Sequence, residues 1–305
     1  MRILIIGASG FLGGHVCQRV AAAGHSVVTA GRSALPGSAA HQIVDLATDQ
    51  PGKVAAMLSA LGPDVVVNCA GLTAGDQDML AAVNITGTYA LVAAMLSSGL
   101  PARLVHIGSA AEYGSGKPGD AVAESTPARP ETSYGSTKLA GTRLVELARS
   151  AGLEAVVLRV FNPLGPGAPE DSLPGRVAAQ LRRLPAGDDS LRLGSLDGVR
   201  DFVDVRDVAD GVLAATVAPA LPHPVLNIGS GRPVLVRSMV RDLLAVSGCS
   251  CAVTEDGPAS ARSAAWSWQQ ADIGRATRDL DWLPRRDLGT SLADMWEASH
   301  DLDIP

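Results

Sequence analysis

The chain of 305 residues is predicted to form an α/β fold, with a doubly wound parallel sheet and a smaller C-terminal lobe. Two observations predict it. Short runs of large aliphatic residues, bounded by glycine or polar residues, alternate along the chain with segments of helical period. Hydrophobic residues make up 47% of the chain and charged residues 18%, which suits a substantial core. Aliphatic runs without polar alternation are typical of strands buried on both faces.

The first aliphatic run, residues 3–6, is closed by Gly7, and Gly10 and Gly13 follow at a spacing of three. A helical pattern over residues 16–23 comes next. In a Rossmann-type fold, this order lets a pyrophosphate approach bare backbone at a helix N-terminus. An ordinary glycine-rich turn is the alternative. The cofactor contacts expected in this turn are Gly7, Ser9, Gly10, Phe11, Leu12 and Gly13.

The end of the second strand, residues 26–30, bears on the choice of cofactor. NAD sites usually carry an acidic residue there, which accepts hydrogen bonds from the ribose 2′-hydroxyl. This chain has Arg32 and Ser33 instead, which suit a 2′-phosphate and favour NADP(H) over NAD(H). A third short strand, residues 42–44, leads to Asp45 and Leu46. These two could flank the adenine, although Asp45 could equally cap the next helix.

Further strands and helices alternate in the same way, as parallel α/β units require. The expected strands are residues 64–68, 103–107 and 154–160, and the expected helices are residues 51–61, 78–98 and 134–150. Three small residues, Cys69, Ala70 and Gly71, follow the 64–68 strand. We expect the cofactor to lie close to this strand end.

Three residues predict the chemistry. Ser109 follows the 103–107 strand, and Tyr134 and Lys138 lie one turn apart on the same face of the next helix. A carbonyl that is reduced takes a hydride on carbon and a proton on oxygen. A tyrosine can donate that proton, a nearby lysine cation can stabilise the phenolate, and a serine hydroxyl can hold the carbonyl oxygen. The alternative is an unrelated surface pair near an unrelated serine.

The glycine turn, Ser109 and the Tyr134–Lys138 pair resemble the extended short-chain dehydrogenase/reductase family over nearly the whole chain. The resemblance implies that Ser109, Tyr134 and Lys138 are the catalytic triad and that Lys138 also bonds the nicotinamide ribose. It implies that Asn84 holds the active-site strand and helix together. The cofactor-binding residues implied also include Asn84, Tyr134 and Phe161. The substrate-binding residues implied are Ser109, Ala110, Ala111, Asn162, Arg200 and Arg262.

The second half extends the resemblance. Residues 173–184 look like a helix over the substrate site, residues 200–208 look like the return into the main sheet, and residues 227–231 look like its last strand. We therefore expect a cofactor domain of residues 1–162 and 204–229. The expected substrate lobe comprises residues 163–203 and 230–305.

Four short segments resemble the GDP-4-keto-6-deoxy-D-mannose reductase group, and related 4-ketoreductases are similar. The segments are Gly108–Ser109, Glu112–Gly114, Gly165–Gly167 and Arg200–Phe202. This implies NADPH-dependent reduction of a nucleotide-linked 4-keto-6-deoxyhexose. Ala110 and Ala111 stand where a 4,6-dehydratase needs an acid pair, which argues against dehydration. An NAD-dependent 4-epimerase, a reductase of polyketide or other natural-product ketones, and a non-catalytic dinucleotide sensor are the alternatives.

Composition bears on location and partners. The net charge of −6 argues against general binding to nucleic acid or to anionic membranes. We expect no membrane span, no signal peptide and a cytoplasmic enzyme. The four cysteines are expected to be thiols, with no metal site. The family resemblance implies a homodimer formed through the helices of residues 78–98 and 134–150.

Overall fold

The computed structural model describes residues 1–33, 40–184, 190–256 and 267–299. Its centre is a seven-stranded parallel sheet with the strand order β3-β2-β1-β4-β5-β6-β11. The strands are β1 (Arg2–Ile6), β2 (Ser26–Gly31), β3 (His41–Ile43), β4 (Val65–Asn68), β5 (Arg103–Ser109), β6 (Ala155–Val160) and β11 (Val225–Ile228). The predicted doubly wound sheet is confirmed, and its chain order reverses between β1 and β4.

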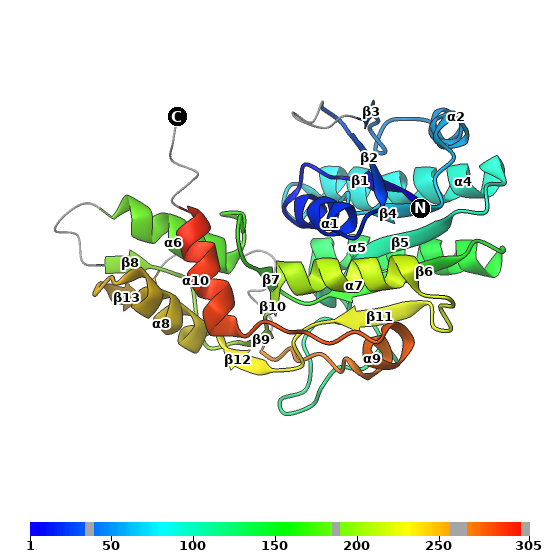
Figure 1. Ribbon diagram of the computed structural model, residues 1–305. Helices are drawn as coiled ribbons and strands as arrows, with labels where there is room; N and C mark the ends of the chain where they lie inside the picture. Colours follow the sequence, from blue (N-terminus) through cyan, green and yellow to red (C-terminus); the bar gives the residue numbers. More distant parts are fainter. Residues whose placement is uncertain (34–39, 185–189, 257–266, 300–305) are drawn as a thin grey trace.

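Helices cover both faces of the sheet (Figure 1). One layer contains α1 (Phe11–Ala22) and α7 (Val205–Val217), and the other contains α2 (Pro51–Leu61), α4 (Gly87–Ser98) and α5 (Ser133–Ser150). Strand β1 shows why the aliphatic runs are continuous. Ile3 and Ile5 pack into the α1–α7 core, whereas Leu4 and Ile6 pack into the other core. Burial of each such side chain contributes about 1.5–3 kcal/mol.

The predicted helix of residues 78–98 is interrupted. It comprises α3 (Gln77–Ala81), a π-helical turn η1 (Ala82–Thr86) and α4. The π turn carries Asn84, whose side chain bonds both backbone groups of Leu72 at 2.9 Å. Single π turns inside α-helices are frequent at functional sites, because they redirect a side chain.

The smaller lobe has a core of its own. It is built from α6 (Leu173–Arg183), α8 (Val236–Ser247), α10 (Leu288–Ser299), β8 (Ser190–Arg192) and β13 (Ala252–Thr254). One part of the predicted substrate lobe belongs elsewhere. Helix α9 (Gly274–Leu280) packs against α7 and β11, and Ala276, Leu280 and Trp282 join the core of the main sheet. Residues 274–282 therefore depart from the expected range 230–305.

The return to the main domain also differs from the expectation. The segment expected to rejoin the main sheet forms β9 (Val199–Asp201) and β10 (Val203–Asp204), which pair outside that sheet with β12 (Pro233–Leu235) and β7 (Pro163–Leu164). The chain then rejoins the main domain as helix α7. Asp204 caps that helix by accepting a bond from the backbone N–H of Arg206 at 2.8 Å.

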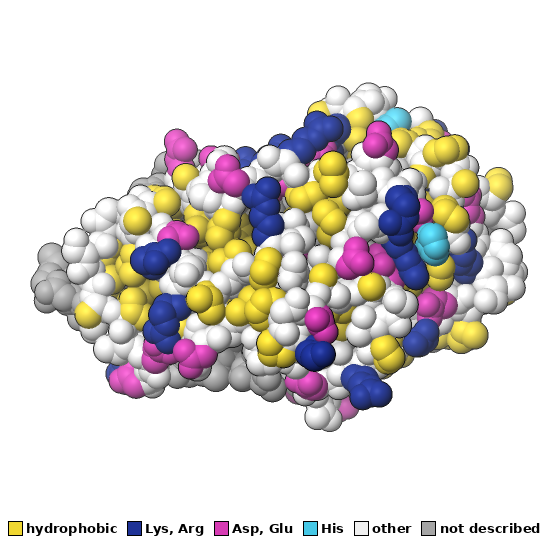
Figure 2. All heavy atoms as spheres, turned by 90° about the horizontal axis from the view of Figure 1, so that it is seen from below, with side chains coloured by type: hydrophobic (Ala, Val, Ile, Leu, Met, Phe, Trp, Pro, Cys, Tyr) yellow, Lys and Arg dark blue, Asp and Glu magenta, His cyan; other side chains and the backbone are white. Residues whose placement is uncertain are grey.

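The surface shows charges of both signs. In Figure 2, basic and acidic side chains are interspersed over the visible face rather than gathered by sign. Within the described ranges, one helical run, Gln77–Ser98, is long and apolar enough to cross a membrane by length and composition alone. No such run was expected from the sequence. Half of its most apolar window is buried inside the protein.

Candidate active site

A cavity of about 830 Å³ opens at the carboxyl ends of β1, β4, β5 and β6. The glycine turn after β1 and the small residues after β4 line one end of it, at the point where the strand order reverses. Residues of the smaller lobe, including Leu173, Leu193 and Phe202, line the other end. Ligands of open α/β sheets bind in this crevice because adjacent loops diverge there and leave room.

The glycine turn is shaped for close backbone contact. Gly7 has φ +81°, and a Cβ there would lie 2.7 Å from the backbone nitrogen of Ala70. A Cβ at Gly13 would lie 2.1 Å from the carbonyl oxygen of Gly7. The N-cap of α1 is Gly10, so no side chain occupies the first turn, and residues 10–13 line the cavity. This uncapped helix N-terminus fits the pyrophosphate of a dinucleotide.

Other predicted cofactor residues divide into two groups. Cys69, Ala70 and Gly71 line the cavity. The predicted cofactor residues outside that lining are Gly7, Ser9, Arg32, Ser33, Asp45, Leu46, Asn84 and Phe161.

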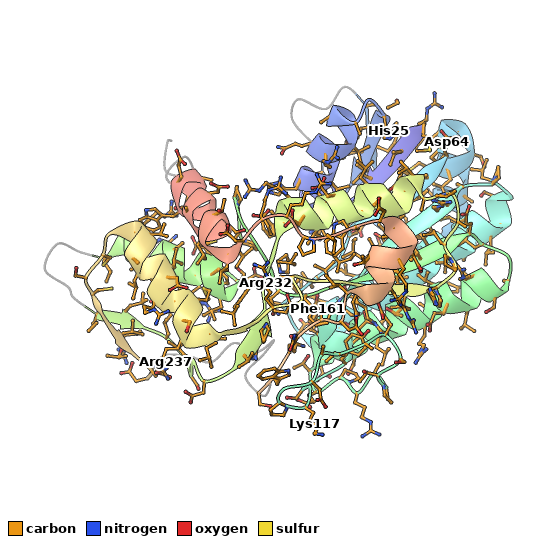
Figure 3. The ribbon with its side chains drawn as sticks, turned by 60° about the horizontal axis from the view of Figure 1, so that its bottom comes forward. His25, Asp64, Lys117, Phe161, Arg232 and Arg237 are labelled. Carbon is orange, nitrogen blue, oxygen red and sulfur yellow. The ribbon has the colours of Figure 1, made fainter. Side chains whose placement is uncertain are left out.

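Arg32 and Ser33 are exposed just beyond β2. Asp45 turns back to accept a bond from the backbone N–H of Ala47 at 3.0 Å, and the N-cap of α2 is Gln50, so Asp45 does not cap that helix. Leu46 is buried in the sheet core. Phe161 is fully buried beside Tyr113, near the middle of the molecule (Figure 3).

The predicted catalytic residues line the same cavity. Ser109 ends β5 and caps the short 3₁₀ turn η2 (Ala110–Glu112), where its hydroxyl accepts a bond from the backbone N–H of Ala111 at 3.2 Å. Tyr134 lies in the first turn of α5. A Cβ at the neighbouring Gly135 would lie 2.4 Å from the carbonyl oxygen of Ala111, so the first turn of α5 packs directly on η2. That close packing brings Tyr134 to the end of β5.

Lys138 is held at the floor of the cavity. Its ammonium donates to the carbonyl oxygen of Ile107 at 2.6 Å, and its side chain is buried. Burial lowers the pKa of Lys138, and the charge of Glu112 partly opposes that effect. Asn84 lies next to it, because one Cβ built on Gly71 would meet Asn84 Oδ1 at 3.5 Å and Lys138 Nζ at 3.7 Å.

Asn84 also fixes helix α5. Its amide donates to the hydroxyl of Thr137 at 3.0 Å, and that hydroxyl donates to the carbonyl oxygen of Tyr134 at 2.9 Å. These bonds connect the π turn to the helix that carries Tyr134 and Lys138.

The far end of the cavity is formed by the smaller lobe and its connections. Arg200 lines it, is buried, and donates to the carbonyl oxygen of Val199 at 2.9 Å. Burial lowers the pKa of Arg200 to about 10. Asn162 also lines the cavity, and its amide donates to the carbonyl oxygen of Asp201 at 2.9 Å. Arg262 lies outside the described residues.

Several polar cavity residues were not predicted from the sequence, among them Arg176, Gln180, Arg192 and Gln269. Arg176 and Gln180 are four residues apart on α6, a spacing that places them on one face and would have been the available signal. Gln269 is buried and donates to the carbonyl oxygen of Ala110 at 3.3 Å, more than a hundred residues earlier in the chain. No local sequence pattern indicates such a contact.

The comparison with protein families agrees with this geometry. A family model described as the NAD dependent epimerase/dehydratase family matches residues 3–229. The chain therefore belongs to this epimerase/dehydratase family. The predicted membership of the extended short-chain dehydrogenases/reductases, which are NAD(P)-dependent oxidoreductases and epimerases, is confirmed.

Similar members of the epimerase/dehydratase family act on nucleotide sugars by name. The chain is 37% identical to dTDP-6-deoxy-L-talose 4-dehydrogenase (NAD(P)(+)) of Kitasatospora kifunensis, covering 97% of this chain and 95% of the relative. It is 30% identical to UDP-glucose 4-epimerase of Streptomyces lividans, covering 97% and 95%. It is 27% identical to GDP-6-deoxy-D-mannose reductase of Pseudomonas aeruginosa, covering 95% and 94%.

Solved structures agree with the fold. MoeE5 in complex with UDP-glucose and NAD superposes with a TM-score of 0.85 at 27% identity, covering 99% of both chains. RMD from Pseudomonas aeruginosa complexed with NADPH superposes with a TM-score of 0.83 at 24% identity, covering 99% of this chain and 98% of that one.

Proposed function

We propose that this protein reduces the 4-keto group of a nucleotide-linked 4-keto-6-deoxyhexose, with NADPH as reductant and Tyr134 as proton donor. The observation that carries the proposal is the convergence of Ser109, Tyr134 and Lys138 in one cavity with the glycine turn. The talose dehydrogenase relative supports it, because oxidation at carbon 4 of a nucleotide-linked 6-deoxysugar is the reverse of this reduction.

The residues divide the work as follows. NADPH, which the glycine turn of residues 7–13 would hold, would supply the hydride for the carbonyl carbon and would become NADP⁺. The Tyr134 phenol gives its proton to the carbonyl oxygen, and the Ser109 hydroxyl holds that oxygen by hydrogen bonding. The Lys138 ammonium stabilises the phenolate that remains, and its burial strengthens this attraction. Solvent then restores the phenol proton.

The charges at the far end of the cavity suit the nucleotide part of the substrate. Arg176 and Arg200 line that end, and guanidinium groups bind diphosphates through planar, paired hydrogen bonds. Ala110 and Ala111, which also line the cavity, bring no acid or base to the sugar. These features favour simple reduction over dehydration and favour a nucleotide sugar over another ketone.

The test uses the purified protein with NADPH and a panel of GDP- and TDP-linked 4-keto-6-deoxyhexoses. Loss of absorbance at about 340 nm reports hydride transfer, which typically reaches about 1–1000 s⁻¹ in enzymes, and NMR of the product reports the new configuration. Turnover of no member of the panel would overturn the proposed activity. We expect Tyr134→Phe to lower kcat by about a hundredfold or more while NADPH still binds. Undiminished turnover in that variant would remove Tyr134 from the proton path.

A 4-epimerase is the second candidate, favoured by the 30% identity to a UDP-glucose 4-epimerase. An epimerase returns the hydride to the same carbon and consumes no net cofactor. Conversion of UDP-glucose to its 4-epimer without added NADPH, together with no net oxidation of NADPH by the ketosugar panel, would favour it over the reductase.

We also propose a homodimer. On α4, Tyr89 and Leu96 are 53% and 42% exposed and lie seven residues apart on one face, and Leu147 of α5 is 67% exposed. Neighbouring helices that expose large apolar side chains suit an isologous interface, because a second copy would bury both sets.

A further inference from the structure

A fully buried carboxylate lies directly beneath the catalytic groups. Glu112, the last residue of η2, has no exposed surface. Its Oε1 accepts a bond from the backbone N–H of Ser109 at 2.8 Å. Its Oε2 accepts from the hydroxyl of Thr142 at 2.8 Å and from Nε of Arg159 at 2.7 Å. Burying a carboxylate costs desolvation free energy, and these hydrogen bonds and the ion pair compensate for that cost. Glu112 is therefore held in one position.

These bonds join the three elements that form the catalytic end of the cavity. Ser109 ends β5, Arg159 belongs to β6, and Thr142 lies on α5 one turn after Lys138. The Glu112 carboxylate packs closely against the backbone of β5, because a Cβ at Gly108 would lie 2.7 Å from Glu112 Oε1. A single side chain therefore fixes the serine backbone relative to the helix that carries Tyr134 and Lys138.

The same carboxylate contributes charge. The titratable groups around Lys138 are Cys69 after β4, His106 on β5, Glu112 on η2 and Tyr134 on its own helix. The pKa of the Cys69 thiol is raised to about 12, mainly by burial, and the pKa of His106 is lowered well below 6.5 by burial. Both groups are neutral near pH 7. The charge of Glu112 raises the pKa of Lys138 and so opposes the effect of burial.

We propose that Glu112 is a positioning residue for catalysis: it locks Ser109 and helix α5 together and supplies the negative charge that balances the Lys138 ammonium. The chemistry that it supports is the proposed reductase function. Glu112 does not line the cavity, so it acts through Ser109 and Lys138 rather than on the substrate. Arg159 completes the unit: its Nε donates to Glu112 Oε2 at 2.7 Å, and its guanidinium lies 4.4 Å from the centre of the Tyr113 ring.

The test compares Glu112→Gln with Glu112→Asp. Glutamine keeps the size and removes the charge, whereas aspartate keeps the charge and shortens the reach. Without the carboxylate charge, either Tyr134 or Lys138 loses a proton more easily, so the ionisation of the pair moves to lower pH. We expect Glu112→Gln to lower kcat about tenfold or more, with KM for NADPH within about twofold, and to shift the alkaline limb down by about one pH unit. Glu112→Asp is expected to lower kcat with the limb unmoved.

The ionisation is also measured without substrate. Absorbance near 295 nm follows phenol ionisation, and subtraction of the Tyr134→Phe titration isolates Tyr134. This readout separates the two proposals: a wild-type enzyme that reduces no ketosugar would overturn the function, whereas the phenol titration would still test Glu112. A folded Glu112→Gln protein with an unmoved titration would overturn the charge role. Wild-type kcat in both Glu112 variants would overturn the positioning role.

Two further variants complete the design. Glu154→Gln is the matched control, because Glu154 also pairs with an arginine, Arg103, but is 51% exposed and far along the sheet from Ser109. It should change neither kcat nor the titration. If circular dichroism shows that Glu112→Gln does not fold, Thr142→Val tests the positioning role instead. It removes one bond from the carboxylate with no change of charge, and we expect kcat to fall about threefold or more with an unmoved titration. Unchanged kcat in Thr142→Val would overturn the positioning role.

Discussion

The glycine turn gives a sharp prediction from two adjacent residues. In Gly13→Ala, the new methyl group would stand 2.1 Å from the carbonyl oxygen of Gly7, 2.8 Å from its carbonyl carbon and 3.0 Å from Cα of Ala8. All three atoms are backbone, so relief requires the turn and α1 to separate. Overpacking in a core typically costs about 1–3 kcal/mol, and rigid backbone places this case at the upper end.

Gly14→Ala is the matched control. Its methyl group would lie 3.8 Å from the nearest atom, the carbonyl oxygen of Ala8, which is ordinary contact. Alanine inside a helix is favoured over glycine by about 0.5–1 kcal/mol, so this variant should be slightly more stable than the wild type. The two variants therefore add the same methyl group at neighbouring positions, but one is expected to lower the free energy of unfolding and the other to raise it.

The assay is urea unfolding followed by circular dichroism, together with NADPH titration followed by cofactor fluorescence. We expect Gly13→Ala to lose about 2–3 kcal/mol of unfolding free energy and to bind NADPH at least about tenfold more weakly, because the helix N-terminus moves away from the turn. Gly14→Ala should bind NADPH as the wild type does and should be slightly more stable. Equal stability and equal NADPH affinity in the two variants would refute the close-packing argument.

Three further predictions concern the cofactor, the dimer and pH. The wild type should have a lower KM for NADPH than for NADH, and Arg32→Ala should weaken that preference; an unchanged ratio of kcat/KM would assign the 2′-phosphate to another group. Leu96→Asp should convert the dimer to a monomer in light scattering, and a monomeric mass for the wild type would end the dimer proposal. His106 is buried with its pKa well below 6.5, so the folded state resists its protonation and the unfolded state does not. Stability should therefore fall as pH drops below 6.5, by up to about 1.4 kcal/mol per pH unit from this group. His106→Gln should remove that part of the slope in urea unfolding, and an unchanged slope would assign it elsewhere.

Local sequence pattern predicted most of the main sheet. Residues 3–6 are aliphatic without alternation because β1 is covered on both faces, and that pattern needs no knowledge of the partners. The glycine spacing and the Tyr134–Lys138 spacing are equally local, since both depend on the geometry of one turn. The sequence therefore determined the sheet, its first turn and the three catalytic candidates.

Boundaries were less predictable where long-range contacts decide them. The π turn at residues 82–86 interrupts a run with a continuous helical pattern, and Asn84 there bonds Leu72 and Thr137 from two other segments. Helix α9 was expected in the smaller lobe, but Ala276 packs into the core of the main sheet. In both cases the outcome depends on contacts with segments far away in the sequence: Leu72 and Thr137 for Asn84, and the core of the main sheet for Ala276.

The sequence by itself determined which chemistry the chain can carry, because phenol, ammonium, hydroxyl and bare glycine backbone are properties of residue type and short spacing. Only the tertiary structure decided what surrounds that chemistry. It placed the side chain of Phe161 in the core, brought Gln269 against Ala110, and put the Glu112 carboxylate between Ser109, Thr142 and Arg159. The physical reason is that a buried polar group must find partners wherever the folded chain presents them, and those partners can be any distance away in sequence.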